Sequence, residues 1–429
     1  MREASASLIF FLVFLKTWWY VIHEVEGNST RRMKCVAEGV NSMTKKVRIA
    51  ALGCGGRWIG LCSLYARIPG VEIVAVCDVA KGAAERAAAV QKENVGYAPS
   101  VYTSFEEMRK NEIYDAIVIT ADPDVQVDFA VAEMDRGIHV MTEVPAAYTI
   151  EQCRRLVDAV EKNGVKYQLA EQTRYWHFIR LWREMAQRGE FGKIMYAEGE
   201  YLHYEEKWDF FQHAETGERV WTNDPSYHNN PLYKKAWRYR AFMDPIWYLP
   251  HELSPLLSIT GGRIERVSCL GTRKGESYTQ GFDVRDLECA LMYNSNDVIF
   301  SLRAGFTAPY GNKKKTNAHW YQIKGTKQSV EWARSGLDEP KLYRPETGWE
   351  LHPEWGTADP DAEELFRSAP HGGADAYPLY DFVRAIIHDE TPAMVVYRAV
   401  ETAAPAIMAV QSAKMGGITL EVPDFRPAK

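Results

Sequence analysis

A short apolar segment followed by a glycine-rich turn constrains the fold of this chain more than any other feature. Residues 47–52 (VRIAAL) predict a buried strand, residues 53–57 (GCGGR) a tight turn, and residues 71–76 a second buried strand that leads to Asp78. A strand, a glycine turn, a helix, a second strand and an acid in this order make the βαβ unit that binds a dinucleotide. The glycines let the backbone approach a pyrophosphate, and the acid can bond the adenosine ribose.

The acid after the second strand also distinguishes the two nicotinamide cofactors. A carboxylate repels a 2′-phosphate, so the sequence favours NAD over NADP. The turn departs from the common fingerprint because a tryptophan stands at the third glycine position, with Gly60 two residues later. The cofactor-binding residues predicted in this unit are Gly53, Gly55, Gly56, Arg57, Trp58 and Asp78.

The first part of the chain alternates between apolar strand-like segments and helical segments. Further strands are expected at residues 116–119, 139–141 and 167–170, with helices such as 81–93 and 125–136 between them. This alternation predicts a parallel, doubly wound sheet. We therefore expect an NAD-binding Rossmann domain over residues 45–170.

The pattern changes after residue 194. Strands with alternating polarity are expected at residues 195–204, 263–270, 287–294, 298–304 and 318–324. Few helices lie between them, which predicts a large open, mostly antiparallel sheet in a second α/β domain over residues 171–429. Two stretches rich in Pro, Gly, Asp and Trp, residues 213–233 and 337–369, are expected to be long surface loops over a site.

Composition argues against several classes of partner. The formal net charge is −6, so the chain has no general attraction for nucleic acid. The seven cysteines show no metal-ligand spacing, and no metal site is predicted. Their odd, scattered arrangement suits a reducing compartment, and we expect a cytoplasmic location.

Residues 1–44 are interpreted as an N-terminal extension. Residues 8–23 (LIFFLVFLKTWWYVIH) are apolar, but they are short for a membrane span and contain Lys16, so no stable span is expected. A poorly formed secretory signal or membrane anchor is an alternative interpretation of residues 8–23. We favour a third interpretation, in which residues 1–42 come from an upstream start and Met43 is the natural beginning.

Residues 137–147 (GIHVMTEVPAA) resemble the glucose–fructose oxidoreductase and inositol dehydrogenase (Gfo/Idh/MocA) family. In that family a strand after a Gly-x-His-Val turn ends in Glu-Lys-Pro, and the lysine assists hydride transfer from a sugar hydroxyl. Val144 occupies the lysine position here and cannot hold or relay a proton. Gln126 is a second departure, since the family commonly has a histidine there.

The Glu-Val-Pro-Ala-Ala segment is similar to one branch of the family, the NAD-dependent glycoside hydrolases of the α-N-acetylgalactosaminidase type. Segments in the same order as in that branch are EQTRY at 171–175, EGEYLH at 198–203, WR at 237–238, YLPH at 248–251, GTK at 325–327 and HGGAD at 371–375. The resemblance runs from about Lys46 to the end of the chain. It is weaker in residues 213–233 and after Tyr310.

This resemblance implies hydrolysis without net redox change. NAD⁺ oxidises the sugar at C3, a base removes the C2 proton, the glycosidic group leaves, water adds, and the sugar is reduced again. Tyr175 is implied as the C2 base, provided that a nearby cation or the cofactor lowers its pKa. His251 is implied as the acceptor of the C3 hydroxyl proton, and His203 as an assisting or sugar-binding group.

The resemblance also implies contacts with the two ligands. Further cofactor contacts are expected from Asp122, Glu143 and Gln172, and contacts with a small carbohydrate substrate from Tyr201, Trp237, Arg238, Tyr310, His371 and Asp375. A homo-oligomer formed through the exposed face of the second sheet is expected. Two other functions stay open, an NAD-dependent sugar or cyclitol dehydrogenase that uses Tyr175 or His251 in place of the lysine, and a non-catalytic NAD-binding sugar sensor.

Overall fold

A computed structural model describes residues 46–204, 209–222, 224–235, 243–274, 284–307 and 318–427. Three predicted substrate contacts, Trp237, Arg238 and Tyr310, lie outside the described residues, as does the apolar segment 8–23. Among the helices that are described, none combines the length and the apolar character needed to cross a membrane.

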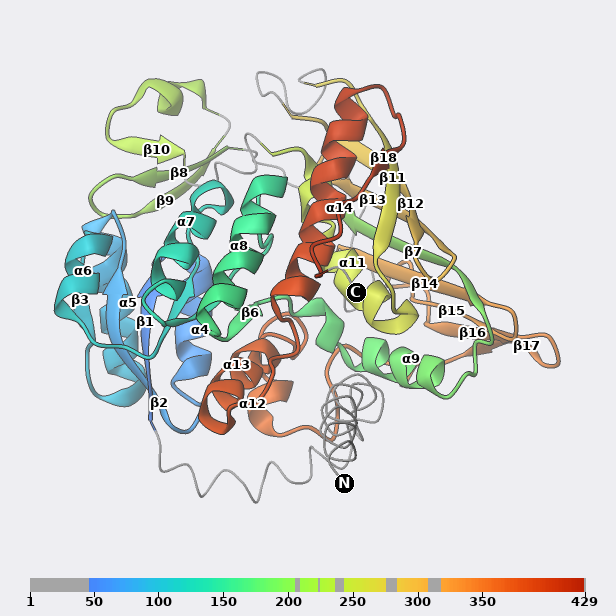
Figure 1. Cartoon of the computed structure of the whole chain (residues 1–429), viewed down its shortest axis with the longest axis horizontal. Coiled ribbons are helices and arrows are strands. Elements are labelled where there is room, and N and C mark those ends of the chain that lie inside the picture. The colour runs from blue at the N-terminus through green and yellow to red at the C-terminus, as the bar shows by residue number, and fades with distance from the viewer. Residues whose placement is uncertain are drawn as a thin grey trace, which may run out of the picture. The chain divides into compact units, whose positions relative to one another are not determined.

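The first sheet has, within the described residues, six parallel strands in the order β3-β2-β1-β4-β5-β6 (Figure 1). The strands are β1 (Val47–Leu52), β2 (Val71–Cys77), β3 (Ser100–Tyr102), β4 (Ala116–Ile119), β5 (His139–Thr142) and β6 (Tyr167–Leu169). The apolar runs of β1 and β4 are almost completely buried, as strands covered on both faces require. The predicted Rossmann sheet is confirmed.

The crossover helices follow the strands as the alternation predicts. They are α4 (Gly56–Tyr65), α5 (Lys81–Val95), α6 (Phe105–Asn111), α7 (Pro123–Met134) and α8 (Ile150–Asn163). Local signals fix the ends of α8, because Thr149 and Gln152 form a reciprocal capping box and Gly164 ends the helix with φ of +61°.

The second sheet is larger and mixed. Its order in the described part of the chain is β17-β16-β15-β14-β7-β13-β12-β11-β18, and the β7–β13 pair is parallel while the other neighbours are antiparallel. The strands are β7 (Ile194–Leu202), β11 (Ile264–Gly271), β12 (Leu287–Asn294), β13 (Val298–Gly305), β14 (His319–Gly325), β15 (Ser329–Glu331), β16 (Lys341–Arg344), β17 (Gly348–Leu351) and β18 (Leu420–Glu421). The predicted open, mostly antiparallel sheet is confirmed.

Helices cover one face of this sheet. Helix α11 (Pro250–Thr260) packs on β7 and on α9 (His177–Gln187), and α14 (Val396–Lys414) packs on β11 (Figure 1). Helix α13 (Ala376–His388) behaves differently, because it packs on α4 and β1 of the first sheet. A segment from the end of the chain therefore completes the core of the nucleotide-binding part.

The two stretches expected to be loops contain regular structure. A separate small sheet is formed by β8 (Asp209–His213), β9 (Arg219–Thr222) and β10 (Tyr233–Lys235), and β16 and β17 extend the large sheet before α12 (Glu364–Arg367). The prediction of loops was wrong here because these strands have only three to five residues, so their turn residues dominate the local composition.

Candidate active site

The glycine turn after β1 is held in a conformation that suits a dinucleotide. Gly53 has φ of +89°, and a Cβ atom there would lie 2.8 Å from the carbonyl carbon of Thr120. The carboxylate of Asp78 accepts hydrogen bonds from the backbone amides of Cys54, at 2.7 Å, and Ala80, at 2.8 Å. The acid and the turn are thus fixed against each other, at the position where a ribose and a pyrophosphate bind in this kind of unit.

Two buried polar atoms belong to residues that follow strands of the parallel sheet, at the carboxyl edge where such a sheet binds a dinucleotide. Within the described residues, Nη2 of Arg57 and Oε1 of Gln172 are buried without a hydrogen-bond partner. Buried polar atoms are normally satisfied, so such atoms point to a bound polar group. Asp122 lies at the N-terminus of α7, directly after β4, on the same edge of the sheet. The residues present therefore fit NAD.

Arg57 connects the glycine turn to the end of the chain. Its Nε donates to Oε1 of Glu143 at 2.6 Å, and its Nη1 donates to Oδ2 of Asp375 at 2.9 Å. His371 Nδ1 lies 2.9 Å from the same oxygen of Asp375. Burial alone would raise the pKa of Asp375, but the charges and hydrogen bonds of Arg57 and His371 together outweigh it and hold the pKa well below its ordinary value.

This network changes the role of one predicted substrate contact. The side chain of Asp375 is only 2% exposed and is bonded to Arg57, so it supports the cofactor side of the site instead of contacting a sugar. The side chain of His371 is 48% exposed and keeps access to a ligand.

Trp58 is also placed differently from the prediction. Its side chain is fully buried and packs in the core with Tyr65, at a ring distance of 6.1 Å. The indole therefore fills the space between α4 and the sheet, where the third glycine would allow close packing, and its ring does not face a cofactor.

Glu143 and Glu171 lie on the same edge of the parallel sheet. Glu143 follows β5, Glu171 follows β6 after Ala170, and the amide of Ala170 donates to the carbonyl of Thr142 at 2.9 Å. The side-chain amide of Gln126 donates to the carbonyl of Glu143 at 3.1 Å, so the residue that replaces the common histidine braces this turn. Parallel sheets bind ligands outside this carboxyl edge.

His251 is positioned at this edge by a buried carboxylate. Its Nδ1 lies 2.8 Å from Oε2 of Glu171, whose side chain is fully buried. The other oxygen of Glu171 accepts from the amide and the hydroxyl of Thr173, at 2.9 and 2.7 Å. The contact is within ion-pair distance but does not have hydrogen-bond geometry, so it places a negative charge beside the imidazole without fixing its tautomer.

The structure brings three of the predicted residues together. The ring of Tyr201 lies 4.6 Å from the ring of His203 and 5.3 Å from that of His251. Tyr248, to which the sequence analysis gave no role, stacks on Tyr201 at 5.4 Å. A second buried pair, His319 and Glu252 at 2.7 Å, lies behind this cluster and was also missed. Only the segment 248–251 and the Tyr-x-His alternation in the sequence pointed to this cluster.

Tyr175 is not part of this cluster. Its hydroxyl donates to Oδ2 of Asp381 at 2.7 Å, and its ring stacks on Tyr377 of α13 at 5.4 Å. Burial, and then the charge of Asp381, raise the pKa of Tyr175 well above its ordinary value, although Arg174 acts in the opposite direction. The hydroxyl is thus bonded to Asp381, and the role of Tyr175 as a base stays a prediction.

Among the described residues no group of three His, Cys, Asp or Glu side chains is placed to hold a metal ion. The candidate site consists of a candidate cofactor cradle, residues 53–57 with Asp78, and a histidine–tyrosine cluster, which comprises His251, Glu171, His203, Tyr201 and Tyr248.

The comparisons with known proteins agree with this arrangement. The profile described as "Oxidoreductase family, NAD-binding Rossmann fold" matches residues 47–171, and the profile described as "Oxidoreductase family, C-terminal alpha/beta domain" matches residues 183–422. An alpha-N-acetylgalactosaminidase from Bacteroides fragilis is 37% identical over 161 residues, which cover 37% of this chain and 38% of that protein. The chain thus matches well under half the length of this relative.

Longer matches are more distant. An alpha-N-acetylgalactosaminidase from Tannerella forsythia is 25% identical over 424 residues, covering 88% of this chain and 86% of that protein. Among solved structures, myo-inositol 2-dehydrogenase from Lactobacillus plantarum has a TM-score of 0.65 at 19% identity, covering 88% of this chain and all of the other. An oxidoreductase domain protein from Kribbella flavida has a TM-score of 0.68 at 18% identity, covering 89% of this chain and all of the other. These two structures establish the fold alone.

Proposed function

The chain belongs to the Gfo/Idh/MocA oxidoreductase family, with an NAD-binding Rossmann domain, and from this premise we propose that it is an NAD-dependent glycoside hydrolase. The reaction is hydrolysis through transient oxidation of the sugar at C3. Two observations favour this reaction over plain dehydrogenation. Val144 replaces the lysine that assists net hydride transfer, and relatives that match the chain are named alpha-N-acetylgalactosaminidases.

The observation that carries the proposal is that the rings of two histidines, His203 and His251, lie 4.6 and 5.3 Å from the ring of Tyr201. Hydrolysis by oxidation and elimination needs two proton transfers, one at the C3 hydroxyl and one at C2. A dehydrogenase needs only the first. His251 and His203 provide two groups of the type that transfers protons, within one cluster.

NAD would be held by the glycine turn and Asp78, with Arg57, Asp122 and Gln172 at its polar groups. When bound, NAD⁺ supplies the oxidation of the C3 hydroxyl and its reversal at the end of the cycle. The proton transfers at the C3 hydroxyl and at C2 are assigned to residues of the chain.

His251 accepts the C3 hydroxyl proton at Nε2, and the buried carboxylate of Glu171 stabilises the imidazolium that forms. His203 removes the C2 proton, which the neighbouring ketone has made acidic, and the glycosidic bond breaks by elimination. Tyr201 and Tyr248 hold the apolar face of the sugar. His371 contacts a substrate hydroxyl, and Trp237, Arg238 and Tyr310 remain predicted substrate contacts.

A sugar or cyclitol dehydrogenase is the second candidate, because the His251–Glu171 pair alone can take the hydroxyl proton. The experiment that separates the two functions is incubation of the purified protein with nitrophenyl glycosides in deuterated water, starting with the α-N-acetylgalactosaminide. Release of nitrophenol with deuterium at C2 of the sugar, and no net NADH, is expected. NADH accumulation from a free sugar without cleavage of any glycoside would establish the dehydrogenase instead. Binding without either reaction would indicate a sensor.

Variants assign the two proton transfers. His203→Asn is expected to abolish the incorporation of deuterium at C2, while His251→Asn blocks the earlier oxidation as well. His388→Asn, an exposed histidine at the end of α13, is the matched control. Wild-type deuterium incorporation in His203→Asn would contradict the assignment of the C2 base.

A further inference from the structure

We propose that the β8–β9 hairpin is a clamp that holds the diphosphate and adenosine half of NAD, with Arg219 as its phosphate contact. The hairpin belongs to the small sheet of β8, β9 and β10 (Figure 1). In the sequence, these strands follow β7 and His203. The inference rests on NAD as the cofactor and not on the reaction proposed above.

The turn of this hairpin is docked on the first turn of α5. The amide of Gly82 donates to the carbonyl of Glu215 at 2.9 Å, and Arg86 donates to the carbonyls of Thr216 and, at 2.9 Å, Gly217. Helix α5 follows directly after β2 and Asp78. The hairpin is thus attached beside the acid that is expected to bond the adenosine ribose.

Glycines on both sides permit this close approach. A Cβ atom on Gly82 would lie 2.7 Å from Cα of Thr216. Gly217 has φ of +66°, and a Cβ atom there would lie 2.9 Å from Cβ of Ala83. Contacts this short do not occur in folded proteins, so each glycine is required for the hairpin to dock as it does.

Arg219, the first residue of β9, reaches from the docked hairpin to the glycine turn. A Cβ atom on Gly55 would lie 2.9 Å from Nη2 of Arg219, and one on Gly56 would lie 3.0 Å from Cζ. The guanidinium therefore lies over the backbone of the turn, where α4 begins.

The charge of Arg219 at this position favours an anion. The N-terminus of a helix carries a partial positive charge, and α4 has no acidic residue in its first turn. A guanidinium beside it adds charge of the same sign. A diphosphate bound there would accept hydrogen bonds from the helix amides and from the guanidinium.

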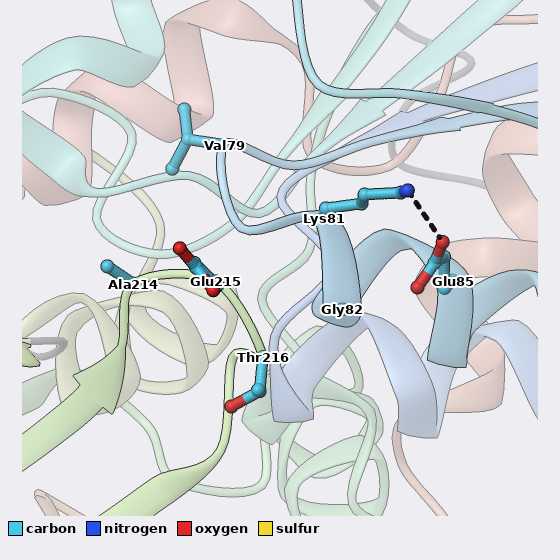
Figure 2. Close-up of a pocket in the computed structure, with 7 residues that line it drawn as sticks. All are labelled: Val79, Lys81, Gly82, Glu85, Ala214, Glu215 and Thr216. Atoms are coloured by element: carbon cyan, nitrogen blue, oxygen red, sulfur yellow. Dashed lines mark ion pairs between the residues drawn. The ribbon is translucent and has the colours of Figure 1, made fainter. Parts of the chain in front are cut away.

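A pocket lies between the hairpin turn and α5, next to Asp78 in the sequence. It has a volume of about 510 Å³ and is lined by Val79, Lys81, Gly82 and Glu85 on one side and by Ala214, Glu215 and Thr216 on the other (Figure 2). Figure 2 shows Lys81 turned toward Glu85, with which it forms an ion pair at 3.5 Å. The volume lies in the range of small-molecule sites and suits the adenosine end of the cofactor.

A clamp of this kind slows the release of NAD. Its turn must leave α5, and Arg219 must leave the diphosphate, before the adenosine half can dissociate. Slow release suits an enzyme that regenerates its cofactor within each turnover, but the release rate can be measured without any turnover.

The test is the rate at which bound NADH leaves the full-length protein. The protein is loaded with NADH, excess NAD⁺ is added, and the loss of bound-NADH fluorescence is followed. Arg219→Gln removes a charge-assisted contact, so release is expected to be about 10- to 100-fold faster. Gly82→Ala leaves Arg219 in place but pushes Thr216 away, and a similar acceleration is expected.

Two controls make the result specific. Arg188→Gln, the same substitution at an exposed arginine after α9, is expected to release NADH at the wild-type rate. Gly82→Ala improves the local helix propensity, so its fold is expected to be intact, which circular dichroism checks. Release from Arg219→Gln at the wild-type rate would overturn the proposal, whatever Gly82→Ala shows. Failure to cleave glycosides would leave these rates, and thus the proposal, unaffected.

Discussion

Nδ1 of His251, near the start of α11, lies 2.8 Å from a carboxylate oxygen of Glu171, which follows the last strand of the parallel sheet. The pair joins the nucleotide-binding sheet to the helix that covers the second sheet. It places a carboxylate beside the imidazole at the carboxyl edge of the parallel sheet, where sheets of this kind bind ligands.

Removal of this carboxylate is expected to slow turnover without loss of binding. Glu171→Gln keeps the size of the side chain but no longer stabilises an imidazolium at His251, so kcat is expected to fall about 100-fold or more, while NAD affinity stays within a few fold. Steady-state kinetics and NADH titration measure the two effects. Glu190→Gln, at a more exposed glutamate, is the control. A wild-type kcat in Glu171→Gln would contradict the role assigned to this pair.

Tyr175→Phe tests the change of role for this tyrosine. Because the hydroxyl donates to buried Asp381, its loss is expected to lower the free energy of unfolding by about 1–3 kcal/mol and to leave kcat nearly unchanged. Urea denaturation and nitrophenol release measure the two quantities. Tyr380→Phe is the control. Tyr380 precedes Asp381 on α13, and its hydroxyl forms no hydrogen bond with the described residues. A large loss of C2 exchange in Tyr175→Phe would restore it as the base.

Arg57→Met breaks a buried charge network. Glu143 and Asp375 would lose their common partner, and the free energy of unfolding is expected to fall by about 3–5 kcal/mol. Arg67→Met, in the loop after α4, is the matched surface control. Denaturation curves without NAD measure the difference. A loss no larger than in Arg67→Met would show that the network does not stabilise the fold.

The network of Arg57, Glu143 and Asp375 predicts that the free energy of unfolding depends on pH in the acid range. The pKa of Asp375 is lowered in the folded state, so its contribution is present above the unfolded pKa of about 3.9 and is lost as pH falls toward the folded value. The difference in unfolding free energy between the wild type and Asp375→Asn is therefore expected to shrink as pH decreases from about 5 toward 3. Urea midpoints at a series of pH values measure it. A constant difference would contradict the pairing.

A homo-oligomer through the outer face of the large sheet remains a prediction. Leu291 on β12 and Ile299 on β13 are 59% and 50% exposed on neighbouring antiparallel strands. Leu291→Glu with Ile299→Glu is expected to convert an oligomer to a monomer, because charges would be buried in the interface. Light scattering after size-exclusion chromatography measures the mass, and Ile113→Glu, at another exposed isoleucine, is the control. A monomeric wild-type protein would contradict the prediction.

Much of the fold could be predicted because its signals are local. The buried run of β1, the turn at Gly53 and the capping box at Thr149 each depend on neighbours within a few residues. The short strands β8, β9 and β10 could not be predicted, because each is stabilised by pairing with its neighbours and not by its own length.

The candidate site, like the fold, could be predicted from the sequence only in part. The motifs containing His203 and His251 drew attention to both residues, but their proximity across Tyr201 depends on how α11 packs on β7. Tyr175 shows the converse, since its motif implied a base, and only the packing of α13 revealed its bond to Asp381 and its raised pKa.

The sequence by itself determined the Rossmann unit, the preference for NAD and the family, because chain neighbours create the glycine turn and place Asp78 after the second strand. The tertiary structure decided which side chains act together. It paired Glu171 with His251, joined Arg57 to Asp375, buried Trp58, bonded Tyr175 to Asp381, and laid Arg219 over the glycine turn. The reason is that charge pairing and burial depend on distance in space. Segments far apart in the sequence come close together only when the two sheets and their helices pack.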